Sequence, residues 1–132
     1  MILRQILHTS PAIASSYLFG CGSKSVGVVV DPVAKPEFYL DSAAELGMQV
    51  RYVIDTHIHA DHLSTGRALA DAADAVYVLH ESVDATFPFQ RVDDGDRVEI
   101  GSSGGEHDRR RKTGTPSDAA PDDQRERPVA MA

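Results

Sequence analysis

The sequence predicts an α/β fold over its first hundred residues, followed by a tail that cannot form a core. Between residues 26 and 79, short β-branched runs alternate with segments whose apolar residues recur at helical spacing. From residue 101 to 132 the chain contains no Ile, Leu, Phe, Tyr, Trp or Cys, so this stretch lacks the side chains that a core buries. We therefore expect a partial domain over residues 1–100 and a low-complexity, disordered tail over residues 101–132.

Three short strands are predicted to open the domain, at residues 2–8, 16–20 and 26–30. The third is a run of valines that stops at Asp31 and Pro32, and an Asp-Pro pair is a common end of a strand. The three strands are expected to form a meander.

The next part of the chain is expected to contain a helix over residues 36–46, a strand over 50–54, a helix over 65–73 and a strand over 75–79. Pro36 suits the first turn of the first helix, and Gly47 is placed to cap its end. Ser64 is the predicted N-cap of the second helix. The run Asp93-Asp94-Gly95-Asp96 predicts a tight turn, after which residues 97–100 are expected to form one half of a hairpin.

Metal-binding side chains are concentrated in residues 54–62, where three histidines and two aspartates occur within nine positions. His57 and His59 are two residues apart, so in an extended backbone both project to one side. Asp61 and His62 can turn toward a second position as the chain leaves the strand. Zinc and iron(II) prefer imidazole nitrogen and carboxylate oxygen. A single histidine near an apolar strand is usually structural, but this density predicts a site for one or two metal ions.

The run Thr56-His57-Ile58-His59-Ala60-Asp61-His62 resembles the signature of the metallo-β-lactamase superfamily, in the form typical of glyoxalase II-like and persulfide dioxygenase-like members. The resemblance implies an αββα sandwich, of which this chain contains the N-terminal half. It also implies that His57 and His59 bind one metal ion, zinc or iron. Asp61 and His62 would bind a second ion, or lie beside the ligands in mononuclear iron members. The same resemblance implies that Asp61 is catalytic and orients the attacking hydroxide.

Three functions remain open from the sequence. The first is metal-dependent hydrolysis of a thioester, lactone or lactam, and the second is a mononuclear iron persulfide dioxygenase. The third is a metal-binding fragment without catalysis, since the third histidine of the family, in a Thr-Pro-Gly-His context, is not recognisable here. His107 lies in the right region but lacks that context. Asp55-Thr56-His57 also resembles the first metal motif of amidohydrolases, but their barrels need about 250 residues.

The abrupt change at Gly101 suggests a specific hypothesis about the tail. A strand pattern gives way there to Ser-Ser-Gly-Gly, whereas domain boundaries usually fall outside completed elements. We therefore consider that residues from about 101 onward are read out of frame. A natural disordered tail on a short binding module is the competing explanation, and translating the two other frames of the coding DNA separates them.

Composition limits the partners of the chain. Residues 1–100 contain 14 acidic and 7 basic residues and so carry the whole net charge of −7, because the charges of the tail cancel. This acidic body disfavours nucleic acid and anionic membranes, and a small-molecule substrate is expected. Cys21 is the single cysteine, and neither a signal peptide nor a membrane-length apolar run is recognisable, so we expect a soluble cytoplasmic protein. His8 and His80 are expected to be structural. An apolar face without its second half is expected to favour self-association.

Overall fold

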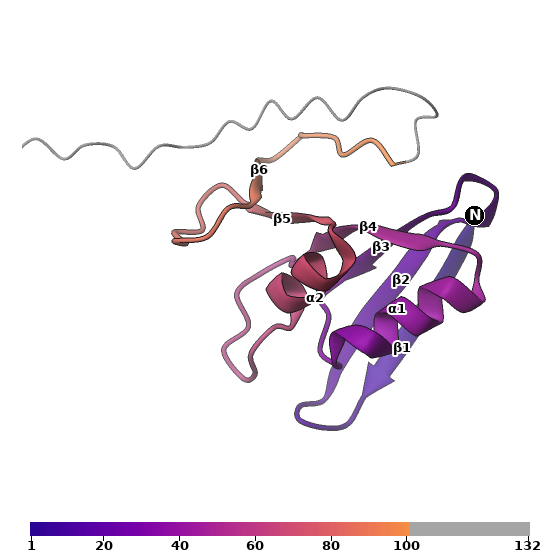
Figure 1. Ribbon diagram of the computed structural model, residues 1–132. Helices are drawn as coiled ribbons and strands as arrows, with labels where there is room; N and C mark the ends of the chain where they lie inside the picture. Colours follow the sequence, from indigo (N-terminus) through magenta and orange to yellow (C-terminus); the bar gives the residue numbers. More distant parts are fainter. Residues whose placement is uncertain (101–132) are drawn as a thin grey trace, which may run out of the picture.

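The computed structural model describes residues 1–100 as one mixed sheet with two helices against it (Figure 1). The sheet contains β1 (Ile2–His8), β2 (Ala14–Cys21), β3 (Val26–Val30), β4 (Gln49–Ile54), β5 (Val76–His80) and β6 (Gln90–Val92), in that spatial order. A short 3-10 helix, η1 (Gly22–Lys24), connects β2 to β3. The pairs β1–β2 and β2–β3 are antiparallel, and the remaining three pairs are parallel. The predicted α/β class is confirmed.

Both helices are crossover connections between parallel strands. Helix α1 (Pro36–Glu45) joins β3 to β4, and α2 (Gly66–Ala73) joins β4 to β5. They pack on the same face of the sheet (Figure 1). Pro36 opens α1, and Gly47 follows its end in the left-handed conformation (φ +69°), as predicted for a C-terminal cap.

The core lies between this face and the helices. Its members share nearly complete burial and come from four strands and both helices: Leu18, Val29, Val53, Leu79, Tyr39, Ala43 and Leu69. In the parallel part of the sheet, β3 and β5 are nearly continuous apolar runs, because strands of this kind are buried on both faces. This burial explains why residues 26–30 were recognisable as a strand without alternating polar residues.

The opposite face of the sheet is also apolar, and neither α1 nor α2 lies on it (Figure 1). Side chains alternate along each strand, so the neighbours of the core residues point to this side. We call it the helix-free face: Leu3, Phe19, Val28, Tyr52 and Val76 in one cross-strand row, Tyr17, Val30, Ile54 and Val78 in the next, and Leu7 on β1. Val28 and Val78, at its centre, are buried, whereas Leu3 and Leu7 at its edge are exposed.

Three details differ from the sequence prediction. The N-cap of α2 is Thr65 rather than Ser64, because the first helical bond runs from the Leu69 N–H to Thr65 O, at 2.9 Å. Residues 97–100 form no strand, since no described strand pairs with them. Instead the three-residue strand β6, which was not predicted, pairs in parallel with β5. The turn at 93–96 is present, with Asp96 N–H donating to Asp93 O at 3.0 Å.

The parallel arrangement brings the carboxyl ends of β3 and β4 to the same edge of the sheet. Val30 lies opposite Ile54, and the backbone N–H of Asp31 donates to Ile54 O at 2.8 Å. The loop after β4 therefore begins beside the loop after β3. Neither α1 nor α2 has the length and apolar character of a membrane-spanning helix. The expected tail and His107 lie outside the described residues.

Candidate metal centre

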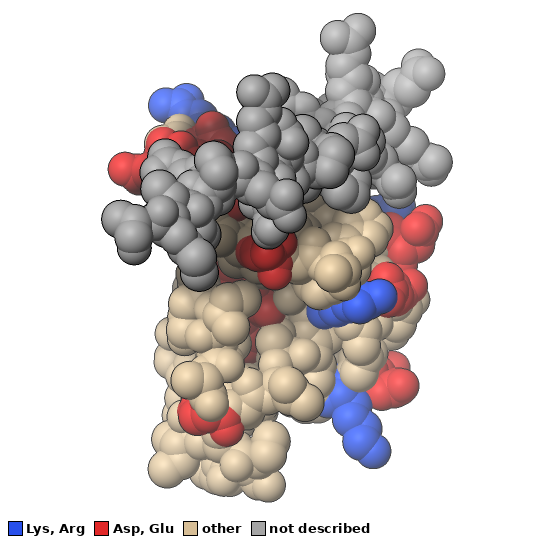
Figure 2. Space-filling view, turned by 90° about the vertical axis from the view of Figure 1, so that its left-hand side faces the viewer, with Lys and Arg blue, Asp and Glu red and all other residues tan. Residues whose placement is uncertain are grey.

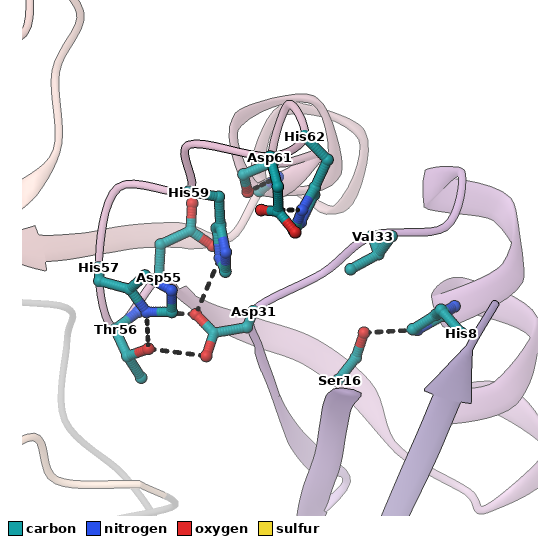
Figure 3. A network of polar contacts seen from close by, with 12 residues as sticks. His8, Ser16, Asp31, Val33, Asp55, Thr56, His57, His59, Asp61 and His62 are labelled. Atoms are coloured by element: carbon teal, nitrogen blue, oxygen red, sulfur yellow. Dashed lines mark hydrogen bonds and ion pairs between the residues drawn. The ribbon is translucent and has the colours of Figure 1, made fainter. Parts of the chain in front are cut away.

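The four predicted ligands lie together in the loop that follows β4 (Figure 3). The rings of His57 and His59 are 4.1 Å apart between centroids, and those of His59 and His62 are 4.4 Å apart. Two groups of potential ligand atoms, each within 4.8 Å, share His59: one adds Asp31 and His57, and the other adds Asp61 and His62. From the sequence we predicted that His57 and His59 bind one metal ion and that Asp61 and His62 lie at a second position. In the structure, His59 belongs to both groups and so connects the two predicted pairs.

Asp31 is the residue of the site that sequence reasoning missed. Its Oδ1 accepts the Thr56 N–H at 2.8 Å, its Oδ2 accepts the Thr56 hydroxyl at 2.7 Å, and Oδ1 lies 3.5 Å from His59 Nε2. Its backbone is left-handed (φ +49°), which costs a non-glycine residue about 1 kcal/mol. Its position at the end of the valine strand was the available signal. Because β3 pairs in parallel with β4, the residue that follows β3 lies beside the loop that follows β4.

The contacts of Thr56 assign the proton of His57. The Thr56 hydroxyl has one proton, and it donates this proton to Asp31. Its 2.8 Å contact with His57 Nδ1 is therefore one in which the histidine donates. A neutral His57 then carries its proton on Nδ1, and Nε2 keeps a free lone pair, which is the form that binds a metal ion.

His62 is held in the same form by its neighbour. Its Nδ1–H donates to Asp61 Oδ1 at 2.9 Å. The hydrogen bond from His62 holds the pKa of the exposed Asp61 carboxyl below its usual value. A charged Asp61 in turn keeps the proton on Nδ1 and leaves Nε2 of His62 free. The second carboxylate oxygen of Asp61 remains available to another donor.

Buried atoms without partners test whether a cation fits. Among the described residues, the buried side-chain atoms that lack a hydrogen bond are Asp55 Oδ1, His59 Nε2 and His62 Nε2. The side chains of His59 and His62 are only 8% and 3% exposed. An unsatisfied buried polar group costs about 1–3 kcal/mol. A divalent cation would satisfy these nitrogen lone pairs, so the residues present fit a metal ion.

Asp55 fixes the start of the loop to strand β5 by hydrogen bonds. Its Oδ2 accepts the Tyr77 hydroxyl at 2.6 Å, and its N–H donates to Val78 O. Burial, together with this carboxylate, raises the pKa of Tyr77 well above its ordinary value, so the phenol stays a neutral donor. Asp55 belongs to neither group of potential ligands. The amidohydrolase alternative is wrong, since two antiparallel strand pairs precede the motif and a (β/α)₈ barrel alternates parallel strands with helices.

Figure 2 views the side of the molecule from which the loop after β4 projects. Acidic atoms lie recessed there between uncharged residues. Carboxylates near a recess give a negative potential that attracts cations. The electrostatic character of this edge therefore suits a positively charged ion.

Comparison with known proteins points to one family. The model of the metallo-beta-lactamase superfamily matches residues 9–128. A hydroxyacylglutathione hydrolase of Gloeothece citriformis is 34% identical over 101 residues, which are 73% of this chain and 39% of that protein. The mitochondrial persulfide dioxygenase ETHE1 of Bos taurus is 24% identical over 102 residues, 76% of this chain and 40% of that protein.

A solved structure gives the same picture. The crystal structure of ETHE1 from Myxococcus xanthus superimposes with a TM-score of 0.69 at 32% sequence identity, and the match covers 76% of this chain and 44% of that one. The match with this chain thus covers between 39% and 44% of the length of these relatives.

Proposed function

Because this chain belongs to the metallo-beta-lactamase superfamily, we propose that it holds a divalent metal ion, zinc or iron, for hydrolysis of a small thioester, lactone or lactam. The observation that supports this proposal best is the meeting of His57, His59 and His62, with the buried Nε2 atoms of His59 and His62 making no hydrogen bond. We propose these three histidines and Asp61 as the metal-binding residues. Asp31 supports them, since each of its oxygens already accepts a hydrogen bond from Thr56.

The protein residues contribute position and proton control. When bound, the metal ion would lower the pKa of its water toward neutrality and polarise a substrate carbonyl. Thr56 and Asp61 keep the protons of His57 and His62 on Nδ1. The free oxygen of Asp61 is exposed and charged, so we propose that it accepts a hydrogen bond from the attacking water and orients it.

A persulfide dioxygenase is the second candidate. It is supported by the likeness to ETHE1 of Myxococcus xanthus, at 32% identity over most of this chain. Each group of potential ligands also combines two imidazoles with one carboxylate, a donor set that mononuclear iron(II) oxygenases use. The two candidates differ in the metal that supports turnover and in the need for dioxygen.

A metal-binding protein with little or no catalytic activity is the third candidate. The Thr-Pro-Gly-His context of the family's third histidine is not found in the sequence. We therefore propose that the chain alone binds metal with reduced affinity and turns over slowly or not at all. From the acidic charge of residues 1–100 we also propose a small-molecule substrate, and neither nucleic acid nor membrane as partner. From the single cysteine, Cys21, we propose a cytoplasmic location.

Metal titration of the purified chain tests the site. We expect zinc and iron(II) to bind the wild-type chain, and a His57→Ala, His59→Ala double variant to lose this binding. His80→Ala is the matched control, because His80 contacts Ser82 and Asp93 away from the motif. Full binding by the double variant would refute the proposed site.

Two assays then separate the catalytic candidates. Hydrolysis of a hydroxyacylglutathione thioester by the zinc-loaded chain would support the hydrolase. Oxygen consumption with a glutathione persulfide by the iron-loaded chain would support the dioxygenase. Stoichiometric metal binding without either turnover would leave the non-catalytic module as the function.

A further inference from the structure

The hydroxyl of Tyr39 makes several hydrogen bonds near the candidate metal centre. Tyr39 lies in α1 and is fully buried. Its oxygen accepts the backbone N–H of Val33 at 2.8 Å and of Ala34 at 3.1 Å. A phenol oxygen that accepts two hydrogen bonds has only its own proton left to donate. That proton goes to Ser16 Oγ, 2.7 Å away.

Ser16 passes the connection to the first strand. Because Ser16 accepts from Tyr39, its own proton is free for His8 Nε2, at 2.7 Å (Figure 3). His8 is therefore the acceptor and carries its proton on Nδ1. Ser16 and Tyr39 are fully buried, so the hydrogen bond between them is shielded from water, whereas His8 is only partly buried. We call His8, Ser16 and Tyr39 the Tyr39 cluster; its members come from β1, β2 and α1.

The cluster fastens the loop that carries Asp31. Val33 and Ala34, which donate to Tyr39, follow Asp31 by two and three positions. On the other side of the loop, Thr65 donates its N–H to Pro32 O at 3.2 Å and its hydroxyl to Ala34 O at 2.7 Å. Residues 31–34 are thus fixed between the cluster and the start of α2. A displacement of this loop would move the Asp31 carboxylate, which accepts two hydrogen bonds from Thr56.

We propose that the Tyr39 cluster consists of positioning residues for the metal centre: by fixing residues 31–34 it sets the Asp31 carboxylate against Thr56 and His59. The inference rests on the metal site proposed above. A single hydrogen-bond partner would have been enough to satisfy the buried phenol. Instead it binds two successive N–H groups of one loop, and the Asp31 of that loop orients the ligand His57 through Thr56.

Zinc affinity, measured by competition with a chromogenic chelator, tests the proposal. Tyr39→Phe keeps the ring and removes only the oxygen, so the N–H groups of Val33 and Ala34 lose their acceptor. We expect zinc affinity to fall about tenfold, the size of effect seen when groups that orient metal ligands are removed. Tyr17→Phe is the matched control, since the Tyr17 hydroxyl has only a 3.5 Å contact with Gln5, remote from the site. Its affinity is expected to be unchanged.

A double-mutant cycle with Asp31→Asn separates positioning from a general loss of stability. If Tyr39 acts through Asp31, then Tyr39→Phe should cost little further zinc affinity in the Asp31→Asn background. Its effect on the free energy of unfolding should be the same in both backgrounds. Additive losses of zinc affinity, or an unchanged affinity in Tyr39→Phe, would overturn the inference.

Two further arms keep the test decisive. If Tyr39→Phe does not fold, Ser16→Ala takes its place, because it removes the 2.7 Å acceptor of the phenol proton and leaves that proton only the longer 3.3 Å contact with His8 Nε2. An unchanged zinc affinity in Ser16→Ala would then overturn the inference. A wild-type chain that binds no zinc or iron would refute the proposed function itself, whereas wild-type binding with no effect of the cluster refutes this inference alone.

Discussion

At the scale of single residues, the site is organised by which nitrogen of each histidine carries the proton. Thr56 is central, because its one hydroxyl connects Asp31 to His57. An amino acid of the same shape without the hydroxyl would leave Asp31 Oδ2 and His57 Nδ1 without this partner, while Asp31 Oδ1 keeps the Thr56 N–H. The His57 proton would then be free to move to Nε2, where it competes with a metal ion.

The substitution Thr56→Val follows from this argument. We expect zinc affinity to fall about tenfold with little change in fold, since valine keeps the volume of threonine. Nitrogen NMR shifts of the His57 ring in the metal-free chain should report a larger population of the Nε2–H tautomer. Thr86→Val, on the loop before β6, is the control, and an equal loss of affinity in that variant would contradict the expectation.

His8 gives the protein a dependence of stability on pH. Burial, and more weakly the charge of His62, lowers the pKa of His8 below the ordinary histidine value of 6.5. The unfolded chain therefore binds the proton more readily than the folded chain. The stability linked to His8 is complete above pH 6.5 and is lost as the pH falls below that value.

Urea unfolding of the metal-free chain at about pH 7.5 and about pH 5.5 measures this effect. We expect the wild-type chain to lose stability between the two pH values. His8→Gln, whose amide oxygen can still accept from Ser16, should lose less. The same loss in both proteins would show that His8 is not the group responsible.

At the scale of elements, the sequence predicted most strands and helices because each is a local pattern. The motif loop was found for the same reason, since its donors lie within nine positions. Asp31 and the Tyr39 cluster were missed because their partners are remote in sequence. Asp31 lies 25 residues from Thr56, and Tyr39 lies 31 residues from His8. Only the parallel register of β3 with β4 and the packing of α1 bring them together.

Short elements were missed for a different reason. Strand β6 has three residues, too few for a periodic pattern to be recognised, and its pairing with β5 defines it. The start of α2 was displaced by one residue because Ser64 and Thr65 both have the hydroxyl of a helix cap. Thr65 instead donates its hydroxyl to Ala34 O, a contact that depends on tertiary structure.

The first residue of α2 admits only glycine. A Cβ on Gly66 would lie 2.8 Å from Tyr77 Cε2 and 3.0 Å from Ser64 Oγ. We expect Gly66→Ala to push the Tyr77 ring away from Asp55 and to lower the free energy of unfolding by about 1–3 kcal/mol. Chemical denaturation would measure this loss. Gly47→Asn is the control, because no atom lies within 4 Å of its Cβ position and asparagine tolerates the left-handed backbone there. A larger loss in the control would refute the steric explanation.

At the scale of the whole molecule, the helix-free face is the side of the sheet on which neither helix packs (Figure 1). Its cross-strand rows are formed by valine, leucine, isoleucine and aromatic side chains, with Gln5 and Gln90 at the two ends of the second row. The acidic residues that make residues 1–100 negative do not occur in these rows. Like charges therefore do not oppose contact between two copies through this face. Apolar area of this kind favours association.

We expect the chain to self-associate through the helix-free face, and a charge at its exposed edge to weaken this association. Leu7 is 75% exposed on that face, so Leu7→Lys should fold normally and shift the chain toward monomer. Ile13→Lys is the control, since Ile13 is 90% exposed in the turn between β1 and β2. Sedimentation velocity over a range of concentrations measures the shift. A wild-type chain that stays monomeric at every concentration would contradict the expectation.

The order of strands in the sheet is the order in which the ribosome makes them. Each new strand pairs with the strand made just before it, so every described strand after β1 finds its partner already synthesised. Loop closure stays short in such a topology, and folding can follow synthesis from the N-terminus. Asp31 and its loop emerge before Thr56 and the histidines that depend on them. During translation, the motif loop therefore meets an Asp31 loop that has already been made, and among the described residues the candidate metal centre lacks only the contacts of Asp55 with Tyr77 and Val78 until β5 follows.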